Sequence, residues 1–256
     1  MPSWNAKQYV KFLKERTQPA IDLANRINIP NPQEIIDIGC GPANSTRVLY
    51  EKFPEAHITG ADNSENMLKQ AKDNNPEFDF ILFDASKDFP KLENKFDVVF
   101  SNACIQWIPN HPKLIKDMMS ILKDGGMLAV QTPMNYKEPI HIIISELVSS
   151  AKWKNKFTKP RIFYNLTQGE YFDLLSEVSS DFSIWETVYC HRMVSHQSIM
   201  EWYKGTGLRP YLEALNEHDA LEFENDVYNE IEKAYPVQAN GEIIFRFPRF
   251  FFTAVK

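Results

Sequence analysis

The chain has 256 residues, of which 43% are hydrophobic and 24% charged, and its net charge is −6. This length can bury a large core, while the acidic balance argues against a general nucleic-acid or membrane-surface role. No apolar run is long enough to span a bilayer, and the start Met1-Pro2-Ser3-Trp4 lacks a secretory signal pattern. The three cysteines are scattered without metal-ligand or redox spacing, so we expect a cytoplasmic protein that uses them structurally.

Strands and helices are predicted to alternate over the first half of the chain. Apolar residues at helical spacing predict helices over 4–25, 45–53, 64–72 and 114–122. Short apolar runs predict strands over 34–38, 57–62, 78–83, 96–102 and 127–131. Such alternation implies right-handed crossovers and one parallel sheet covered by helices.

The alternation fails after Thr132-Pro133, where a mostly helical, aromatic-rich region runs to about residue 181. A strand over 182–191, helices over 198–215 and 219–235, a turn at Gly241 and a last strand over 243–254 follow. Pro248 cannot donate a ladder hydrogen bond, so we expect a bulge or an edge position there.

These elements predict an α/β protein with a seven-stranded, mostly parallel sheet flanked by helices and an inserted, mostly helical cap. We assign residues 1–135, 182–192 and 241–256 to the core. Residues 136–181 and 193–240 are assigned to the cap, which we expect to bind the second substrate.

The glycine-containing turn after the first strand is the strongest functional signal. Gly39 and Gly41 let the backbone turn sharply and approach a ligand closely. Ser45 and Thr46 are expected to cap the free amides of the following helix. The loop lacks the third glycine of a dinucleotide site and the Lys-Ser/Thr pair of a triphosphate site, so NAD and ATP fit less well.

Two acids narrow the ligand further. Asp37 precedes the glycines, where a ligand with an ammonium group would need an acid, and Asp62 ends the second strand, where an acid commonly holds ribose hydroxyls. Asp84 ends the third strand and could accept the adenine amino group, while the Ala85 amide could meet a ring nitrogen. S-adenosyl-L-methionine, with an ammonium, a ribose and an adenine but no phosphate, fits this set best.

The sequence also resembles the trans-aconitate methyltransferases, which have a Rossmann-like methyltransferase fold. The segments that carry the resemblance are Trp4-Asn5 with Arg16, Ile36 to Pro42 with Asn44-Ser45-Thr46, Ile58-Thr59-Gly60 with Asp62, Asn102-Ala103 with Gln106-Trp107, Gly207 to Pro210, and Phe247-Pro248-Arg249. Ala43 departs from the glycine that the family more often has, and its methyl group is tolerated there if the local φ is negative.

The resemblance implies cofactor roles for Asp37, Gly39, Gly41, Asp62, Asp84 and Asn102. To these we add Asn63, Ala85, Trp4 and Arg16. The first helix, with Trp4 and Arg16, could close over the cofactor as a lid, or its aromatic residues could simply pack it on the sheet.

The acceptor, if it is a tricarboxylate, requires cations in a desolvated pocket, preferably the planar fork of arginine. Arg209 is the first candidate, and Gln106 and Trp107 could line the transfer site. The second-rank candidates are Lys204, His191, His196 and Tyr203, and Tyr136, just past the fifth strand, is another. A core role for Trp107 and a solvated surface position for each basic residue are the alternatives.

A carboxylate is ionised at neutral pH and needs no general base to accept a methyl group. We find no nucleophilic triad, no convincing base and no metal-ligand motif, so no catalytic residue and no metal are assigned. The first hypothesis is an O-methyltransferase that esterifies trans-aconitate or another small polycarboxylic acid, with no nucleic-acid or membrane partner. The alternatives are an N- or C-methyltransferase of another metabolite and a non-catalytic S-adenosylmethionine-binding protein.

Overall fold

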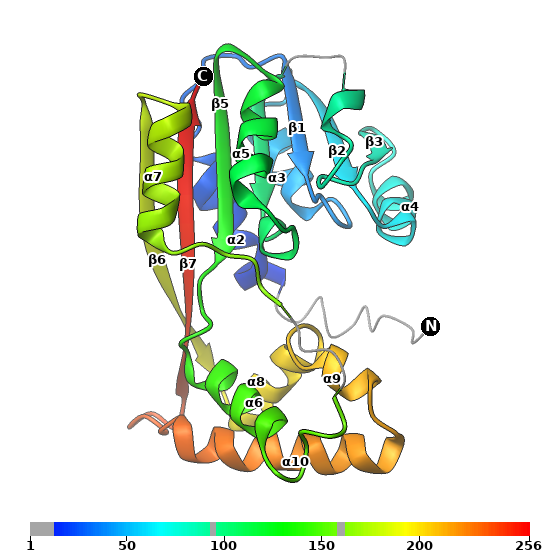
Figure 1. Cartoon of the computed structure of the whole chain (residues 1–256), viewed down its shortest axis with the longest axis vertical. Coiled ribbons are helices and arrows are strands. Elements are labelled where there is room, and N and C mark those ends of the chain that lie inside the picture. The colour runs from blue at the N-terminus through cyan, green and yellow to red at the C-terminus, as the bar shows by residue number, and fades with distance from the viewer. Residues whose placement is uncertain (1–12, 93–95, 158–161) are drawn as a thin grey trace. The chain divides into compact units, whose positions relative to one another are not determined.

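The computed structural model describes residues 13–92, 96–157 and 162–256 of the chain (Figure 1). The chain folds as two compact units. The glycine-loop unit comprises Thr17–Pro133, Phe163–Thr187 and Arg249–Lys256. The helical unit comprises Met134–Ile162 and Val188–Pro248 together with the described part of Met1–Arg16. The first helix was predicted over 4–25, and only its part from Leu13 lies within the described residues.

The predicted seven-stranded sheet is confirmed, with strand order β3-β2-β1-β4-β5-β7-β6. The strands are β1 (Glu34–Ile38), β2 (His57–Asp62), β3 (Asp79–Leu82), β4 (Phe96–Asn102), β5 (Leu122–Pro133), β6 (Phe182–Met193) and β7 (Ile243–Val255). β1 to β5 pair in parallel, and β7 pairs antiparallel with β5. β1 is almost wholly buried, as expected for a parallel strand that is covered on both faces.

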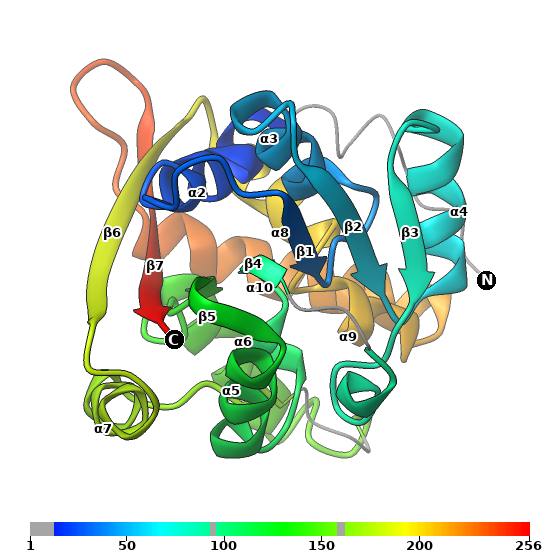
Figure 2. The same ribbon diagram turned by 90° about the horizontal axis from the view of Figure 1, so that it is seen from above.

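Helices cover both faces of the sheet in the glycine-loop unit. They are α2 (Leu13–Ala24), α3 (Asn44–Lys52), α4 (Glu65–Asn74), α5 (His111–Ser120) and α7 (Gln168–Val178). Figure 2 shows α2 and α3 on one face and α5 and α7 on the other. The predicted Ser64 cap of α4 is confirmed, since its hydroxyl accepts the Met67 N–H at 3.4 Å.

The helical unit contains α6 (Pro139–Ser149), α8 (His196–Lys204), α9 (Arg209–Glu213) and α10 (Glu217–Ala234) around an aromatic core. The prediction of one helix over 198–215 is wrong, because the chain turns after Lys204 and resumes as α9. Gly207 lies against the Tyr203 ring, and a Cβ there would come within 2.7 Å of it. The turn therefore needs glycine for close packing.

The pairing of β7 with β5 shows how the sheet accommodates Pro248. β7 lies between β5 and β6, so it is not an edge strand, and its pairing with β5 is continuous up to Pro133 and Arg249. Pro248 comes directly beyond this pairing, where its carbonyl accepts the Met134 N–H at 3.1 Å. The missing proline N–H is thus placed where the regular ladder has ended.

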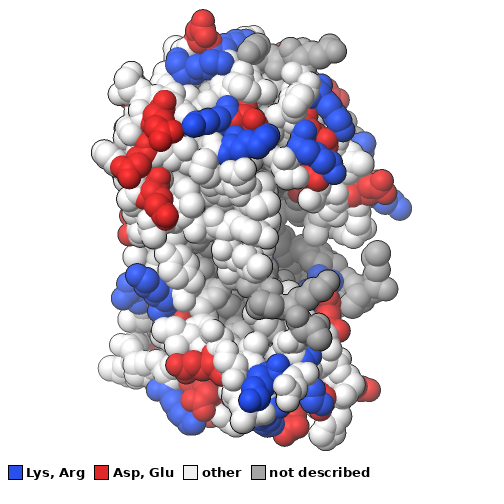
Figure 3. Space-filling view, in the orientation of Figure 1, with Lys and Arg blue, Asp and Glu red and all other residues white. Residues whose placement is uncertain are grey.

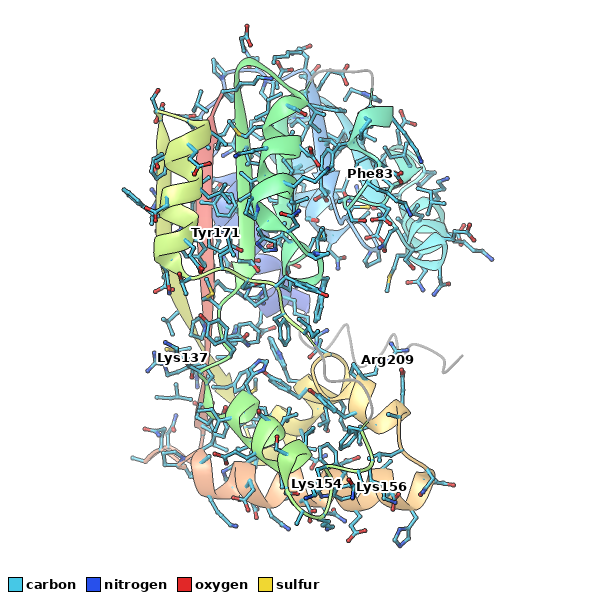
Figure 4. The ribbon with its side chains drawn as sticks, viewed as in Figure 1. Phe83, Lys137, Lys154, Lys156, Tyr171 and Arg209 are labelled. Carbon is cyan, nitrogen blue, oxygen red and sulfur yellow. The ribbon has the colours of Figure 1, made fainter. Side chains whose placement is uncertain are left out.

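The segment 163–181, which the sequence assigned to the cap, belongs to the glycine-loop unit. Tyr171 of α7 points to the sheet, where its ring stacks on Phe250 at 5.2 Å (Figure 4). The Tyr171 hydroxyl lies 2.7 Å from His111 Nδ1, and His111 Nε2 lies 2.9 Å from the Ile105 carbonyl oxygen. Nε2 must donate to that carbonyl, so Nδ1 of the neutral ring accepts from Tyr171. Burial lowers the pKa of His111, which favours this neutral form.

No helix among the described residues is both long and apolar enough to cross a membrane.

We predict that Tyr171→Phe lowers the free energy of unfolding by about 1 to 3 kcal/mol, because it leaves the buried His111 Nδ1 without its donor. Urea unfolding measures this change. Tyr50→Phe is the matched control, since Tyr50 is exposed, and it should change stability by less than about 0.5 kcal/mol. Equal unfolding midpoints for the two variants would contradict the role of the Tyr171 hydroxyl.

Candidate functional site

The carboxylate of Asp37 organises the turn that follows β1. Asp37 is fully buried, and its Oδ2 accepts the hydroxyls of Ser45 at 2.6 Å and Thr46 at 2.8 Å. The prediction that these hydroxyls cap α3 is therefore wrong. The hydroxyls donate to the buried carboxylate because leaving a buried charge unpaired costs far more free energy than leaving the amides at a helix end unpaired.

The residue at the start of α3 is Ala43, which has no side-chain cap and lies in the left-handed region, with φ 74°. The condition on which the methyl group was expected to be tolerated, a negative φ, is therefore not met. An L-residue pays about 1 to 2 kcal/mol for this conformation. The Ala43 methyl group is buried in a cluster with Leu68 and Phe80, which offsets part of that cost.

The two glycines serve different purposes. A Cβ at Gly39 would lie 2.2 Å from the Cys104 sulfur, so Gly39 is needed for packing as well as for its positive φ. A Cβ at Gly41 would meet nothing within 4 Å, although its φ is also positive. Gly41 therefore leaves its surroundings open for a close ligand approach.

Asp62, at the end of β2, holds the glycine turn in place. Its Oδ2 accepts the Gly41 N–H and its Oδ1 accepts the Ser64 N–H, both at 2.9 Å. Each carboxylate oxygen retains a second lone pair, so both can also accept a ligand hydroxyl. Asn63, next to it, is exposed.

Asp84 is tied to its own turn. Its Oδ1 accepts the Ser86 hydroxyl at 2.6 Å and amide at 3.0 Å, and its Oδ2 lies 3.0 Å from Lys87 Nζ. The Ser86 and Lys87 hydrogen bonds lower the pKa of Asp84 to about 2. Asp84 is thus a stable anion beside the buried Ala85.

Two buried oxygen atoms on β1 and β4 lack hydrogen-bond partners among the described residues. They are Oδ1 of Asp37 on β1 and Oδ1 of Asn102 on the neighbouring strand β4. Burial raises the pKa of Asp37 to about 6. Two unpaired acceptors, one of them a carboxylate, fit a ligand that brings N–H donors and a positive charge.

Gln106 and Trp107 follow β4 in a short helical turn, η2 (Ile105–Trp107). The Gln106 amide donates to the Ala103 carbonyl at 2.6 Å, and its oxygen accepts the Thr132 hydroxyl at 3.3 Å. Trp107 is 41% exposed, so a core role is excluded for it, and it packs against Phe163 at 4.9 Å. Sequence reasoning missed Asn165, which donates to the Pro133 carbonyl at 2.6 Å and contacts Thr132, because no local pattern marks it.

The other candidates belong to the helical unit, except Trp4, which lies outside the described residues. The Arg16 guanidinium lies over the Trp202 ring at 5.1 Å, and His191 packs on that ring at 4.9 Å. The Tyr203 hydroxyl lies 3.4 Å from the Asn135 amide nitrogen, which donates to it. Tyr136 is exposed, and His196 Nε2 lies 2.8 Å from the Tyr235 carbonyl oxygen.

The two cations of α8 and α9 already have acidic partners. Lys204 pairs with Glu224 at 2.6 Å, and Arg209, at the start of α9 (Figure 4), pairs with Glu213 at 2.5 Å. A substrate carboxylate would have to compete with these glutamates.

Comparisons with known proteins identify the kind of domain. A family model described as a methyltransferase domain matches residues 31–207. A solved structure of coclaurine N-methyltransferase, bound to N-methylheliamine and S-adenosylhomocysteine, covers 94% of this chain and 71% of its own, with TM-score 0.56 and 15% identity. The YcgJ protein from Bacillus subtilis gives TM-score 0.57 at 13% identity and covers 93% of this chain and 98% of its own. At these identities the likeness shows the fold alone.

Curated relatives are much closer in sequence. A trans-aconitate 2-methyltransferase from Rhodopseudomonas palustris (strain BisB18) is 41% identical and covers 100% of both chains. Another from Enterobacter sp. (strain 638) is 40% identical and covers 99% of this chain and 98% of its own.

Fold and glycine turn together define a methyltransferase of the S-adenosylmethionine-dependent class. Within that class, the chain belongs to the trans-aconitate 2-methyltransferase family.

We predict that Asp37→Asn changes how the stability of the ligand-free protein depends on pH. Because burial raises the pKa of folded Asp37 from 3.8 to about 6, the wild type loses stability as pH rises through this interval, and the asparagine variant does not. Between pH 4 and 7 the variant should gain on the order of 3 kcal/mol relative to wild type, which urea unfolding at several pH values measures.

Asp97→Asn is the control, because the pKa of Asp97 is shifted in the opposite direction to that of Asp37. Burial opposes ionisation of Asp97, but hydrogen bonds from Lys123 and the amides of Glu34 and Gln33 lower its pKa overall. That variant should lose stability relative to wild type as pH rises. If the stability of Asp37→Asn changed with pH in parallel with that of wild type, the pKa of Asp37 would not be raised in the folded protein.

Proposed function

We propose that this protein transfers a methyl group from S-adenosylmethionine to a carboxylate of trans-aconitate or a similar small polycarboxylic acid. The observation that carries the cofactor assignment is the pair of buried, unpaired oxygens of Asp37 and Asn102 beside the open surroundings of Gly41. The names of the relatives support the acceptor.

In the proposed complex Asp37 and Asn102 accept hydrogen bonds from the ammonium group of the cofactor. Asp62 accepts from the ribose hydroxyls with its remaining lone pairs, and Asp84 and the Ala85 amide meet the adenine. Bound S-adenosylmethionine supplies an electrophilic methyl group on a sulfonium. Neutralisation by the ammonium would also return the pKa of Asp37 toward its ordinary value.

The acceptor needs alignment rather than a base. A carboxylate is already ionised at neutral pH, so the protein acts by holding it in line with the methyl group and by excluding water. Gln106 is a candidate in the glycine-loop unit, where Thr132 and Ala103 fix its side chain. In the helical unit the candidates are Tyr136, His191, Tyr203, Lys204 and Arg209.

We further propose that the protein acts in the cytoplasm on small molecules, without a nucleic-acid partner. Its three cysteines are all free, which suits a reducing compartment. On the face in Figure 3, Lys and Arg are interspersed with Asp and Glu, unlike the continuous basic surface that binds a phosphate backbone.

Acceptor profiling with purified enzyme tests the proposed reaction. We expect S-adenosylhomocysteine to be released with trans-aconitate and related di- and tricarboxylates, but not with amines or phenols, and only slowly without acceptor. If only amines or phenols were methylated, the proposal of a carboxylate acceptor would be wrong and the acceptor would belong to one of those classes. Cofactor binding without any turnover would indicate a non-catalytic binding protein.

We predict that Asp62→Asn weakens S-adenosylhomocysteine binding by about 1.5 to 3 kcal/mol, because an amide offers one oxygen where the loop and the ribose need two. Its NH₂ would also face one of the two backbone donors. Titration calorimetry measures the affinity. The control Glu65→Gln removes the same charge from an exposed position three residues away and should leave the affinity unchanged. An unaltered affinity in Asp62→Asn would show that Asp62 does not bind the ribose.

A further inference from the structure

Four polar side chains form a row across the sheet of the glycine-loop unit: Asp37, Asn102, Gln131 and Arg249. Register places them on one face, because side chains two residues apart in a strand point the same way. Asp37 pairs with Phe100, two residues before Asn102, and Asn102 pairs with Gln131. Gln131 pairs with Phe251, two residues after Arg249.

This is the face that α2 and α3 cover. At one end of the row, Ser45 and Thr46 of α3 donate to Asp37. At the other end, Phe251 stacks on Trp185 at 5.1 Å, and Arg26, just after α2, lies over the Trp185 ring at 4.9 Å. The row therefore lies between the sheet and its helices, at the carboxyl ends of β1, β4 and β5.

Gln131 is unusual in the row because both polar atoms of its buried side chain lack hydrogen-bond partners among the described residues. These atoms are Nε2 and Oε1, and the side chain is 0% exposed. A leucine would fill similar space without burying two unpaired polar atoms, so glutamine is costly to the ligand-free protein. A ligand that hydrogen-bonds with this carboxamide would recover the cost.

Arg249 supplies the charge beside Gln131. It is 7% exposed, and it lies on β7 diagonally across from Gln131, a separation that long side chains can bridge. A guanidinium stays charged at any ordinary pH and presents a planar fork of donors that matches a carboxylate. The Gln131 NH₂ adds donors on the same face.

The row thus has only acceptors unpaired on β1 and β4, whereas β5 and β7 add N–H donors, with the Gln131 oxygen as one further acceptor. We propose that Gln131 and Arg249 bind a carboxylate of the acceptor that is not the one methylated. This inference rests on the proposed function. The carboxylate of the cofactor's own amino-acid end fits less well, because β1 and β7 lie three strand spacings apart, roughly 14 Å, whereas an α-carboxylate shares a carbon with its ammonium.

The test is a pair of variants, Gln131→Leu and Arg249→Lys, in the full chain. Binding of S-adenosylhomocysteine is measured first by calorimetry, and trans-aconitate is then titrated into the protein saturated with it. Both variants should bind trans-aconitate at least about tenfold more weakly and keep S-adenosylhomocysteine affinity within about twofold. Gln131→Leu should also raise the melting temperature of the ligand-free protein by about 2 to 4 °C, which a merely structural glutamine would not do.

Thr253→Val is the matched control. Thr253 lies two residues beyond Phe251, the partner of Gln131, whereas Arg249 lies two residues before it. Thr253 pairs with Ala129 and is therefore farther from the carboxyl ends of the strands, so Thr253→Val should bind both ligands as wild type does. Unchanged trans-aconitate affinity in both test variants would overturn the inference, and so would a loss confined to S-adenosylhomocysteine. Absence of trans-aconitate binding by wild type would instead refute the proposed function, and the inference with it. If Gln131→Leu does not fold, Arg249→Lys alone decides by the same criteria.

Discussion

The buried carboxylate of Asp37 is the interaction on which the rest of the site depends. Ser45 and Thr46 turn their hydroxyls to it, and α3 begins after Ala43, which is left-handed and has no side chain that could cap the helix. Desolvation leaves Asp37 easier to protonate than an ordinary aspartate. The turn after β1 is therefore arranged around an anion that is only partly satisfied by the protein itself, which is the condition for binding a cation.

Asp62 secures the same turn from the neighbouring strand. Its two oxygens accept the amides of Gly41 and Ser64, so the glycine turn is held before any ligand arrives. Preorganisation of this kind lowers the entropy that binding must otherwise overcome. The two glycines of this Gly-x-Gly motif have different roles. Gly39 allows close packing on Cys104, and Gly41 leaves space for a ligand.

The polar row also shows how this protein exchanges stability for binding. Asp37, Asn102 and Gln131 bury atoms that lack partners among the described residues, while Ile36 and Ile38, on either side of Asp37, are apolar and buried. In the helical unit, by contrast, Lys204 and Arg209 are neutralised by Glu224 and Glu213. Arg249 is more deeply buried than these half-exposed side chains, so its charge is screened less by solvent and salt.

The sequence by itself determined the strands, their alternation with helices, and the acids at or just beyond the ends of β1, β2 and β3, because apolar periodicity and turn residues are local properties. It also identified the family through short motifs. Only the tertiary structure decided that Ser45 and Thr46 serve Asp37 and not the helix, that Ala43 is left-handed, and that α7 packs on the sheet through Tyr171. It alone placed Gln131 beside Arg249, since that depends on the register between strands more than a hundred residues apart, which no single segment specifies.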